Sequence, residues 1–140
     1  HIVNIASVAG RLPTPGLSIY NGVKAGVIEF SEALDAELLP LGVRVSAVLP
    51  TFTRTGLISG LRTNSVVQAV EPDDVAEIIV KTIAQPRVRV TAPKTMAWVH
   101  GNTLIGAGVK RRIRRSTGLD RMFLDYDTGA RAEYTERIAR

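Results

Sequence analysis

Two β-branched apolar runs, separated by one long helical segment, constrain the fold of this chain more than any other feature. The first run, residues 1–6, reads HIVNIA, and the second, residues 43–49, reads VRVSAVL. Between them, residues 18–39 carry apolar side chains at intervals of three and four, which indicates a helix of about 22 residues, roughly 33 Å long. Strand, long helix and strand in this order are typical of two parallel strands joined by a crossover.

The helix between these runs is expected to have a defined buried side and defined ends. Ser18 is the expected N-cap, and Pro40 with Gly42 is expected to end the helix. The apolar positions that recur along one side predict a buried stripe made of Val23, Val27, Phe30, Leu34 and Leu38.

A second helix and a third strand follow. Residues 71–74 read EPDD, and a proline with acidic neighbours suits the first turn of a helix over residues 72–85. Residues 88–92, VRVTA, are again β-rich, and the second run at residues 43–49 is apolar enough for a strand covered on both faces. The stripe expected to be buried in the second helix consists of Val75, Ile78, Ile79, Thr82 and Ile83. The order β-α-β-α-β places the chain in the α/β class.

Residues 93–140 are less regular and more basic than the rest. Residues 1–86 hold six Lys/Arg and eight Asp/Glu, whereas residues 87–140 hold twelve and five. An apolar segment at residues 96–109 precedes the basic run KRRIRR at residues 110–115, and residues 120–140 could form a terminal helix. We therefore divide the chain into residues 1–92, which carry the α/β pattern, and a tail over residues 93–140.

The composition excludes several classes of protein. Without cysteine there is neither a disulfide scaffold nor a thiolate metal site, and two histidines are too few for a metal cluster, so no bound metal is expected. No segment is long and apolar enough to span a membrane, and nothing resembles a signal peptide, which favours the cytoplasm. The first run looks like the inside of a buried strand. Because it starts in mid-strand, we expect these residues to be the C-terminal part of a longer protein.

Three side chains with catalytic potential fall at the carboxyl ends of the predicted strands, where open parallel sheets bind their ligands. Ser7 follows the first strand, and Tyr20 and Lys24 lie four residues apart, on one face of the helix. An ammonium about 4 Å from a phenol oxygen favours its ionised form by about 4 kcal/mol at an effective dielectric of ~20. Tyr20 could then act as a general acid or base, while Ser7 hydrogen-bonds the same substrate oxygen.

Each of these residues also has an ordinary structural interpretation. A tyrosine four residues before a lysine occurs by chance in many helices, and a serine after a strand is usually a turn residue. Thr51, Thr53 and Thr55, which follow the second strand, could be plain loop residues with solvated hydroxyls. Only the joint arrangement favours a catalytic site.

The joint arrangement resembles the C-terminal half of the short-chain dehydrogenase/reductase family. IVNIASVAG at residues 2–10 looks like the family's fifth strand and serine turn, and YNGVK at residues 20–24 matches its Tyr-x-x-x-Lys signature, thirteen residues after Ser7. GVRVSAVLP at residues 42–50 looks like the sixth strand. The resemblance covers residues 1–92 and implies the C-terminal half of a doubly wound, parallel-sheet Rossmann fold, followed by a helical tail that covers the substrate.

The resemblance also implies an oxidoreductase that moves a hydride between NAD or NADP and a hydroxyl or carbonyl group. Tyr20 would be the general acid/base, and Ser7 would steady the substrate oxygen. Lys24 would assist Tyr20 and hydrogen-bond the nicotinamide ribose. The segment TFTRT at residues 51–55 would contact the nicotinamide together with the residue before it, Pro50.

Within that segment, Thr53 through its backbone and Thr55 through its hydroxyl would hold the carboxamide. Thr51 stands where the family usually has glycine, which would narrow the space beside the nicotinamide. The Gly-rich loop that binds pyrophosphate has no counterpart in the sequence. We therefore assign the activity to the longer parent protein and expect these 140 residues alone to be inactive.

Apolar residues after the sixth-strand segment favour a lipophilic alcohol or ketone as substrate. The alternative, that these residues only pack the covering segment, is equally compatible with the sequence. The residues concerned are Phe52, Leu57, Ile58, Leu61, Val66 and Val67.

Partners follow from the resemblance and from the tail. Helices 18–39 and 72–85 would form the contact between subunits of a homo-oligomer. The basic run suits a solvated helix best, contact with a membrane surface second, and nucleic acid least, because no aromatic platform accompanies it. Trp98 and His100 are expected to pack. The alternative to an enzyme is a truncated, non-catalytic remnant or a membrane-associated binding module.

Overall fold

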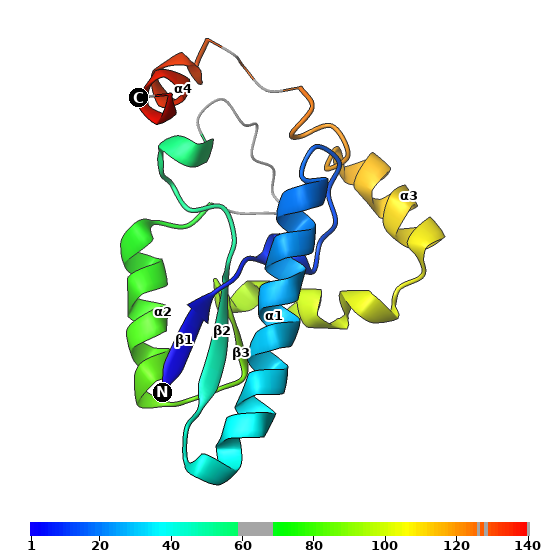
Figure 1. The fold of residues 1–140 in the computed structure, drawn as a ribbon. Helices are drawn as coiled ribbons and strands as arrows, with labels where there is room; N and C mark the ends of the chain where they lie inside the picture. Colours follow the sequence, from blue (N-terminus) through cyan, green and yellow to red (C-terminus); the bar gives the residue numbers. More distant parts are fainter. Residues whose placement is uncertain (59–68, 126, 128, 140) are drawn as a thin grey trace.

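A three-stranded parallel sheet organises the fold (Figure 1). The computed structural model describes residues 1–58, 69–125, 127 and 129–139. The strands occur in the spatial order β1-β2-β3 and confirm the predicted α/β class. The strands are β1 (Ile2–Ile5), β2 (Val45–Pro50) and β3 (Arg89–Ala92), and the helices are α1 (Ser18–Leu38), α2 (Pro72–Ala84), α3 (Ala107–Thr117) and α4 (Ala132–Ile138). Short 3-10 helices are η1 (Val8–Gly10), η2 (Leu39–Leu41), η3 (Gly56–Ile58) and η4 (Lys94–Leu104).

The central strand is the buried one. Every residue of β2 is buried, as its continuous apolar run predicts, because β2 is flanked by a strand on each side. In β1, by contrast, Ile2 and Ile5 are 41% and 45% exposed. The prediction of a buried first strand is therefore wrong for these two residues, since β1 is the edge strand of the described sheet.

Helices α1 and α2 lie on opposite faces of the sheet (Figure 1). The side of α1 that packs inward holds Asn21, Ile28, Ser31 and Asp35. The predicted apolar stripe is wrong in part, because Val23 and Phe30 are each 59% exposed.

Polar side chains can lie on the buried side of α1 because they are hydrogen-bonded. The Asn4 amide donates to the Ser31 hydroxyl at 3.0 Å. Asp35 accepts bonds from the Arg44 guanidinium at 2.9 and 3.1 Å and from the backbone N–H of Val45 at 2.7 Å. Hydrogen-bonded polar groups can be buried at low cost, and an apolar pattern does not reveal such positions.

Helix α2 begins as its sequence predicts. Glu71 and Asp74 form a reciprocal capping box, and Pro72 occupies the first turn. Thr82 is buried and donates to the Ile78 carbonyl at 2.7 Å, but Ile83, which belongs to the predicted buried stripe, is 55% exposed. The face of α2 that contacts the sheet is therefore narrower than the apolar pattern predicts.

The start of α1 differs from the prediction. Ser18 is the first helical residue and the N-cap is Leu17, so Ser18 is not the cap. At the other end the chain passes through η2 to Gly42, which has a left-handed φ of 74° that favours glycine. Pro50 is the last residue of β2, and it pairs with Ala92 of β3.

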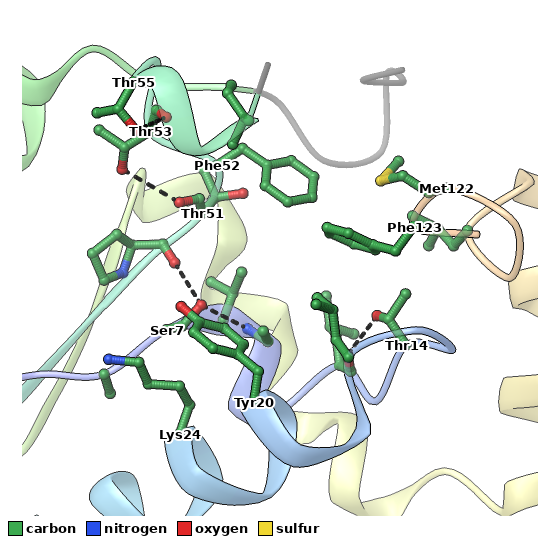
Figure 2. Close-up of a pocket in the computed structure, with 18 of the residues that line it drawn as sticks. Ser7, Thr14, Tyr20, Lys24, Thr51, Phe52, Thr53, Thr55, Met122 and Phe123 are labelled. Atoms are coloured by element: carbon green, nitrogen blue, oxygen red, sulfur yellow. Dashed lines mark hydrogen bonds between the residues drawn. The ribbon is translucent and has the colours of Figure 1, made fainter. Parts of the chain in front are cut away.

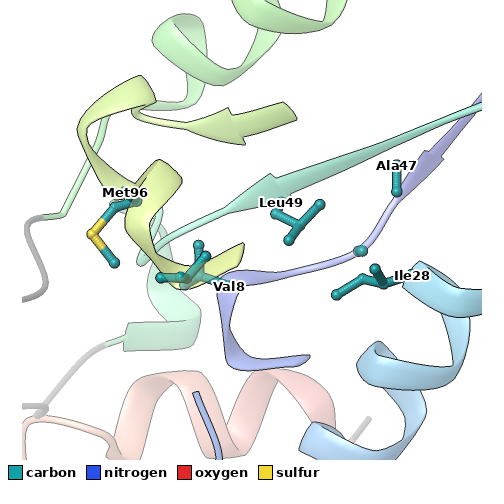
Figure 3. Close-up of a cluster of buried hydrophobic side chains, with 7 residues drawn as sticks. Val8, Ile28, Ala47, Leu49 and Met96 are labelled. Carbon is teal, nitrogen blue, oxygen red and sulfur yellow. The ribbon is translucent and has the colours of Figure 1, made fainter. Parts of the chain in front are cut away.

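The main apolar core joins the sheet, α1 and the beginning of the tail (Figure 3). Met96 and Val99 from η4 pack with residues of β2 and α1 and with the residues that follow β1. The buried members of this core are Ala6, Val8, Ile28, Ala47, Leu49, Met96 and Val99.

The tail is helical in three separate pieces. Its basic run lies on α3, and the terminal helix, predicted within residues 120–140, is confined to α4. In the described part of the chain, no helix is both long and apolar enough to cross a bilayer.

Candidate functional site

A cavity of about 350 Å³ lies at the carboxyl ends of β1 and β2. One side of it, which we call the polar floor, consists of Ser7, Tyr20, Lys24 and Thr51. The other side, the apolar cover, consists of Phe52, Ile58, Leu119, Met122 and Phe123. The cavity therefore has hydroxyl and ammonium groups on one side and hydrocarbon on the other (Figure 2). Thr14 and Arg131 also line it.

Ser7 follows β1 directly and is fixed on both sides of its hydroxyl. Its Oγ accepts a bond from the backbone N–H of Ala9 at 3.1 Å, which caps η1, and it donates to the Pro50 carbonyl at 3.4 Å. The residue is 9% exposed. These bonds tie the end of β1 to the end of β2 and hold the hydroxyl at the cavity.

Tyr20 and Lys24 lie near the start of α1, one turn apart. The Lys24 ammonium is 5.7 Å from the centroid of the Tyr20 ring and donates to the Ile5 carbonyl at 3.0 Å. Figure 2 shows the Tyr20 ring directed toward Ser7, with Lys24 on the neighbouring turn. Tyr20 is 40% exposed, so its phenol can be reached from solvent through the cavity.

Two residues that the sequence reasoning missed hold the serine turn against α1. The buried Asn21 side chain donates to the carbonyls of Ala9 and Leu12, the latter at 3.1 Å. Gly10 lies so close to α1 that a Cβ there would come within 2.8 Å of backbone atoms of Lys24 and Ala25. The sequence carried no signal for Asn21, because an apolar pattern assigns a polar residue of a helix to solvent.

The predicted nicotinamide-contact segment also borders the cavity, which is lined by Pro50, Thr53 and Thr55. The Thr53 hydroxyl donates to the Thr51 carbonyl at 3.5 Å, and the Thr55 hydroxyl donates to the Thr53 carbonyl at 3.4 Å. The segment is anchored to Val70, which donates to the Phe52 carbonyl at 2.7 Å.

The apolar cover comes from two distant parts of the chain. The rings of Phe52 and Phe123 lie 5.6 Å apart with a tilt of 53°, and Leu119 and Met122 are buried beside them. Phe52 and Ile58 line the cavity. The side chain of Leu57, and Leu61, Val66 and Val67, which were expected to contribute, lie outside the described residues. The sequence reasoning missed Leu119, Met122 and Phe123, whose spacing of three and four was the available signal.

Other titratable groups lie away from this cavity. His100 does not line it, and burial, followed by the nearby Arg89 and Arg11 charges, lowers the pKa of the imidazole. The Arg44 guanidinium, together with the Val45 N–H, lowers the pKa of Asp35 at the opposite end of β2. Trp98 is 49% exposed rather than packed. Within the described ranges, no group of three His, Cys, Asp or Glu side chains is placed to hold a metal ion.

The polar floor has the parts needed for proton transfer at an alcohol or carbonyl oxygen. A phenol can give or accept a proton, and a second hydroxyl held nearby can hydrogen-bond the same oxygen. Both groups are supplied by the elements that the sequence predicted, because the carboxyl ends of neighbouring parallel strands meet at one edge of a sheet.

Comparison with known proteins shows which family the sequence resembles. Residues 1–65 match the family model for short chain dehydrogenase. The chain is 38% identical over 84 residues to a 3-oxoacyl-[acyl-carrier-protein] reductase of Synechocystis, covering 56% of this chain and 34% of that protein. It is 34% identical over 93 residues to carbonyl reductase family member 4 of Xenopus laevis, covering 62% and 39%. The chain thus spans little more than a third of the length of these relatives.

Solved structures give the same result. A short-chain dehydrogenase from Sphingobium yanoikuyae in complex with NADPH superposes with a TM-score of 0.60 at 30% identity, over 81% of this chain and 44% of that one. A 4-hydroxyisoleucine dehydrogenase complexed with NADH superposes with a TM-score of 0.55 at 26% identity, over 64% and 43%. The sheet is therefore part of a Rossmann fold, and residues 1–65 are similar to short-chain dehydrogenases.

Proposed function

We propose that these residues carry the catalytic end of an NAD(P)-dependent oxidoreductase that interconverts a hydroxyl and a carbonyl group. The observation that carries the proposal is the convergence of Ser7, Tyr20 and Lys24 on one cavity. Because the chain spans little more than a third of its curated relatives, the activity proposed is that of the whole protein.

In this proposal Tyr20 moves the proton. During reduction its phenol gives a proton to the substrate oxygen, and during oxidation the phenolate takes that proton back. Ser7 hydrogen-bonds the same oxygen, and its bonds to Ala9 and Pro50 keep it in place. Lys24 places a positive charge beside the ring, with its ammonium 5.7 Å from the ring centroid.

The residues fit the nicotinamide end of the cofactor. NAD or NADP, when bound, supplies or accepts the hydride at the substrate carbon. Lys24 and Tyr20 would bind the ribose, and Pro50, Thr53 and Thr55 would flank the nicotinamide, since they line the same cavity. Complexes of similar structures with NADPH and NADH support this assignment.

The sequence offers no matching residues for the pyrophosphate end of the cofactor. The sequence contains no Gly-rich loop of the kind that binds pyrophosphate at a helix N-terminus. The purified 140-residue chain is therefore expected to show no turnover of an alcohol with NAD or NADP. Measurable reduction of either cofactor by this chain alone would contradict that expectation.

The substrate class is proposed to be a lipophilic alcohol or ketone. The cavity holds hydrocarbon from Phe52, Ile58, Leu119, Met122 and Phe123, and it is large enough for a small or medium-sized ligand. The alternative, that these side chains serve only to pack the cover, predicts no preference for longer alkyl chains.

A homo-oligomer is proposed to form through the outward faces of α1 and α2. On α1, Ile19 is 83% exposed, and Val23 and Phe30 are 59% exposed. On α2, Val80 and Ile83 are 65% and 55% exposed. Because the two helices cover opposite faces of the sheet, they would form two separate interfaces with copies of this chain.

A membrane-associated binding module is the second candidate function, and helix α3 favours it. Val109 and Ile113 are 54% and 46% exposed on a helix whose other positions include Lys110, Arg111 and Arg112. Arginine beside exposed apolar groups suits anionic lipid. Co-sedimentation with anionic but not neutral phospholipid vesicles, abolished by Ile113→Glu, would support this candidate.

Replacement of the Tyr20 hydroxyl tests the proposed chemistry. In the full-length protein, Tyr20→Phe is expected to lower kcat by about 100-fold or more. Tyr134→Phe is the matched control, because Tyr134 lies on α4 and does not line the cavity. Equal turnover by both variants would remove Tyr20 from the mechanism.

A further inference from the structure

Helix α3 presents a row of arginines on its exposed side. Arg111, Arg112 and Arg115 are exposed and, together with Gly108, line a hollow of about 180 Å³. Their spacing of three, four and seven residues from Gly108 places them on one face of the helix, which we call the arginine face. The space beside Gly108 is open, since nothing lies within 4 Å of a Cβ added there.

The charges of the arginine face are not neutralised within the molecule. Among the residues that the structure describes, none of the ion pairs involves α3. Like charges one helical turn apart, such as Arg111 and Arg115, repel each other, and Lys110 in the first turn opposes the helix dipole. An anionic partner outside the chain would relieve both effects.

Two exposed apolar side chains lie beside the arginine face. Val109 and Ile113 are one turn apart. At about 100° per residue they fall between Arg112 and Lys110 around the helix. A short apolar strip with cations on both sides is the pattern of helices that lie in the plane of a membrane surface. Nucleic acid would use the cations but not the apolar strip, so the combination favours an anionic lipid surface.

Helix α3 is also connected to the cavity of the proposed active site. Arg114 donates to the Pro13 carbonyl at 3.2 Å. The neighbours of Pro13 in the sequence, Leu12 and Thr14, line the cavity, and Figure 1 shows α3 beside this loop. Soon after α3 ends, the chain enters the apolar cover at Leu119. A surface bound to α3 would therefore lie beside the apolar side of the cavity.

We propose that α3 docks the protein on an anionic phospholipid surface, from which the cavity takes its lipophilic substrate. The proposal rests on the proposed function and adds where the substrate comes from. Arg111, Arg112 and Arg115 bind lipid phosphate groups, to which a guanidinium can donate two parallel bonds. Val109 and Ile113 enter the boundary between headgroups and acyl chains. In this arrangement the membrane-binding helix serves the enzyme and is not an alternative to it.

The first measurement is co-sedimentation of the full-length protein with vesicles. Vesicles of phosphatidylcholine alone are compared with vesicles that also contain phosphatidylserine. The arginine variant, which combines Arg111→Gln, Arg112→Gln and Arg115→Gln, is expected to bind the anionic vesicles about 100-fold more weakly than wild type.

A matched control removes the same number of charges away from α3. It replaces three exposed cations by glutamine, at Lys81, Arg87 and Lys94. Its binding should stay within about threefold of wild type, because charges away from the lipid surface are screened by salt. Equal losses in the arginine variant and the control, or equal binding of wild type to both kinds of vesicle, would overturn the proposal.

A second variant separates lipid from nucleic acid. Val109→Ala combined with Ile113→Ala keeps every charge and shortens the apolar strip. It should weaken vesicle binding by about tenfold and leave binding to a DNA duplex unchanged. A duplex bound by wild type as tightly as the anionic vesicles, at the same salt concentration, would overturn the proposal and indicate a nucleic-acid surface.

The second measurement is turnover of two alcohols, one long-chain and carried in the vesicles, the other short and dissolved in water. For wild type, phosphatidylserine is expected to raise kcat/KM for the long-chain alcohol by about tenfold, since docking raises the local concentration of substrate. The arginine variant should lose this increase and turn over the short alcohol as wild type does, because none of its three residues lines the active-site cavity.

The two measurements separate this proposal from the proposed function. If neither alcohol is turned over but vesicle binding depends on the arginine face, the docking surface stands and the proposed reaction fails. If the short alcohol is turned over and phosphatidylserine leaves the long-chain rate unchanged, the reaction stands and the docking proposal is overturned.

Discussion

The polar floor and the apolar cover face each other across one cavity but are built in different ways. The floor comes from the segments that follow β1 and β2 and from the start of α1. Hydrogen bonds made by Ser7 and Asn21 hold these parts together. The cover joins residues 52–58 to residues 119–123 through apolar and ring contacts. In the proposed function, the floor sets the type of reaction, whereas the cover sets which substrates enter.

Removing a hydroxyl from the floor should have the largest effect. Ser7→Ala is expected to lower kcat of the full-length protein by about 100-fold, because the substrate oxygen loses a hydrogen-bonding hydroxyl held at the cavity. Steady-state kinetics measures this effect, and Ser18→Ala, at an exposed position at the start of α1, is the control. A loss of less than threefold would show that Ser7 only caps η1.

Shifting the floor without changing its chemistry should have the next largest effect. A Cβ at Gly10 would lie 2.8 Å from Ala25 N and Ile28 Cδ1, so Gly10→Ala should lower the free energy of unfolding by about 1–3 kcal/mol and reduce turnover. Gly22→Ala is the matched control, because nothing lies within 4 Å of its added Cβ. Thermal and denaturant unfolding of both variants measure the difference, and equal stability would contradict the tight packing of η1 on α1.

Opening the cover should leave the reaction intact and alter substrate preference. Phe123→Ala removes one ring of the Phe52 pair and is expected to raise KM for long-chain alcohols by about tenfold, with kcat for a short alcohol within twofold. Leu104→Ala, at a residue that is 90% exposed, is the control. If kcat for the short alcohol falls as much as affinity for the long one, floor and cover do not have separate roles.

The smallest effect is expected far from both regions, at Asp35. Its pKa is lowered by the bond from Arg44, so the folded state binds a proton less readily than the unfolded state. The stability contributed by this ion pair is therefore present above the ordinary carboxyl pKa of 3.8 and is lost as the pH falls through the lower pKa of the folded state. Asp35→Asn should flatten the decline of unfolding free energy measured by denaturant titration below about pH 5. An unchanged slope would show that the bond to Arg44 does not stabilise the fold.

The sequence predicted the floor better than the cover, and the reason is physical. Strand order and a four-residue helical spacing are local properties, so Ser7, Tyr20 and Lys24 could be placed at one sheet edge before the structure was known. The pairing of Phe52 with Phe123 depends on the path of the tail, which no local pattern specifies.

The error in α1 has a different origin. The apolar pattern predicted that Val23 and Phe30 are buried, but both are exposed. Ser31 and Asp35 lie on the buried side of α1 instead. Hydrophobic periodicity assigns polar residues to solvent, and it fails where each buried polar group has a specific partner, as Ser31 and Asp35 have in Asn4 and Arg44.

The edge position of β1 has a consequence for handling the molecule. Within the described residues β1 pairs only with β2, which leaves backbone donors and acceptors of its other side available to a further strand. An open edge of this kind recruits strands from other polypeptides, and the exposed Ile2 and Ile5 add apolar surface to it. Supplying a separate polypeptide with the matching strand should suppress concentration-dependent aggregation and reconstitute a larger sheet from two pieces.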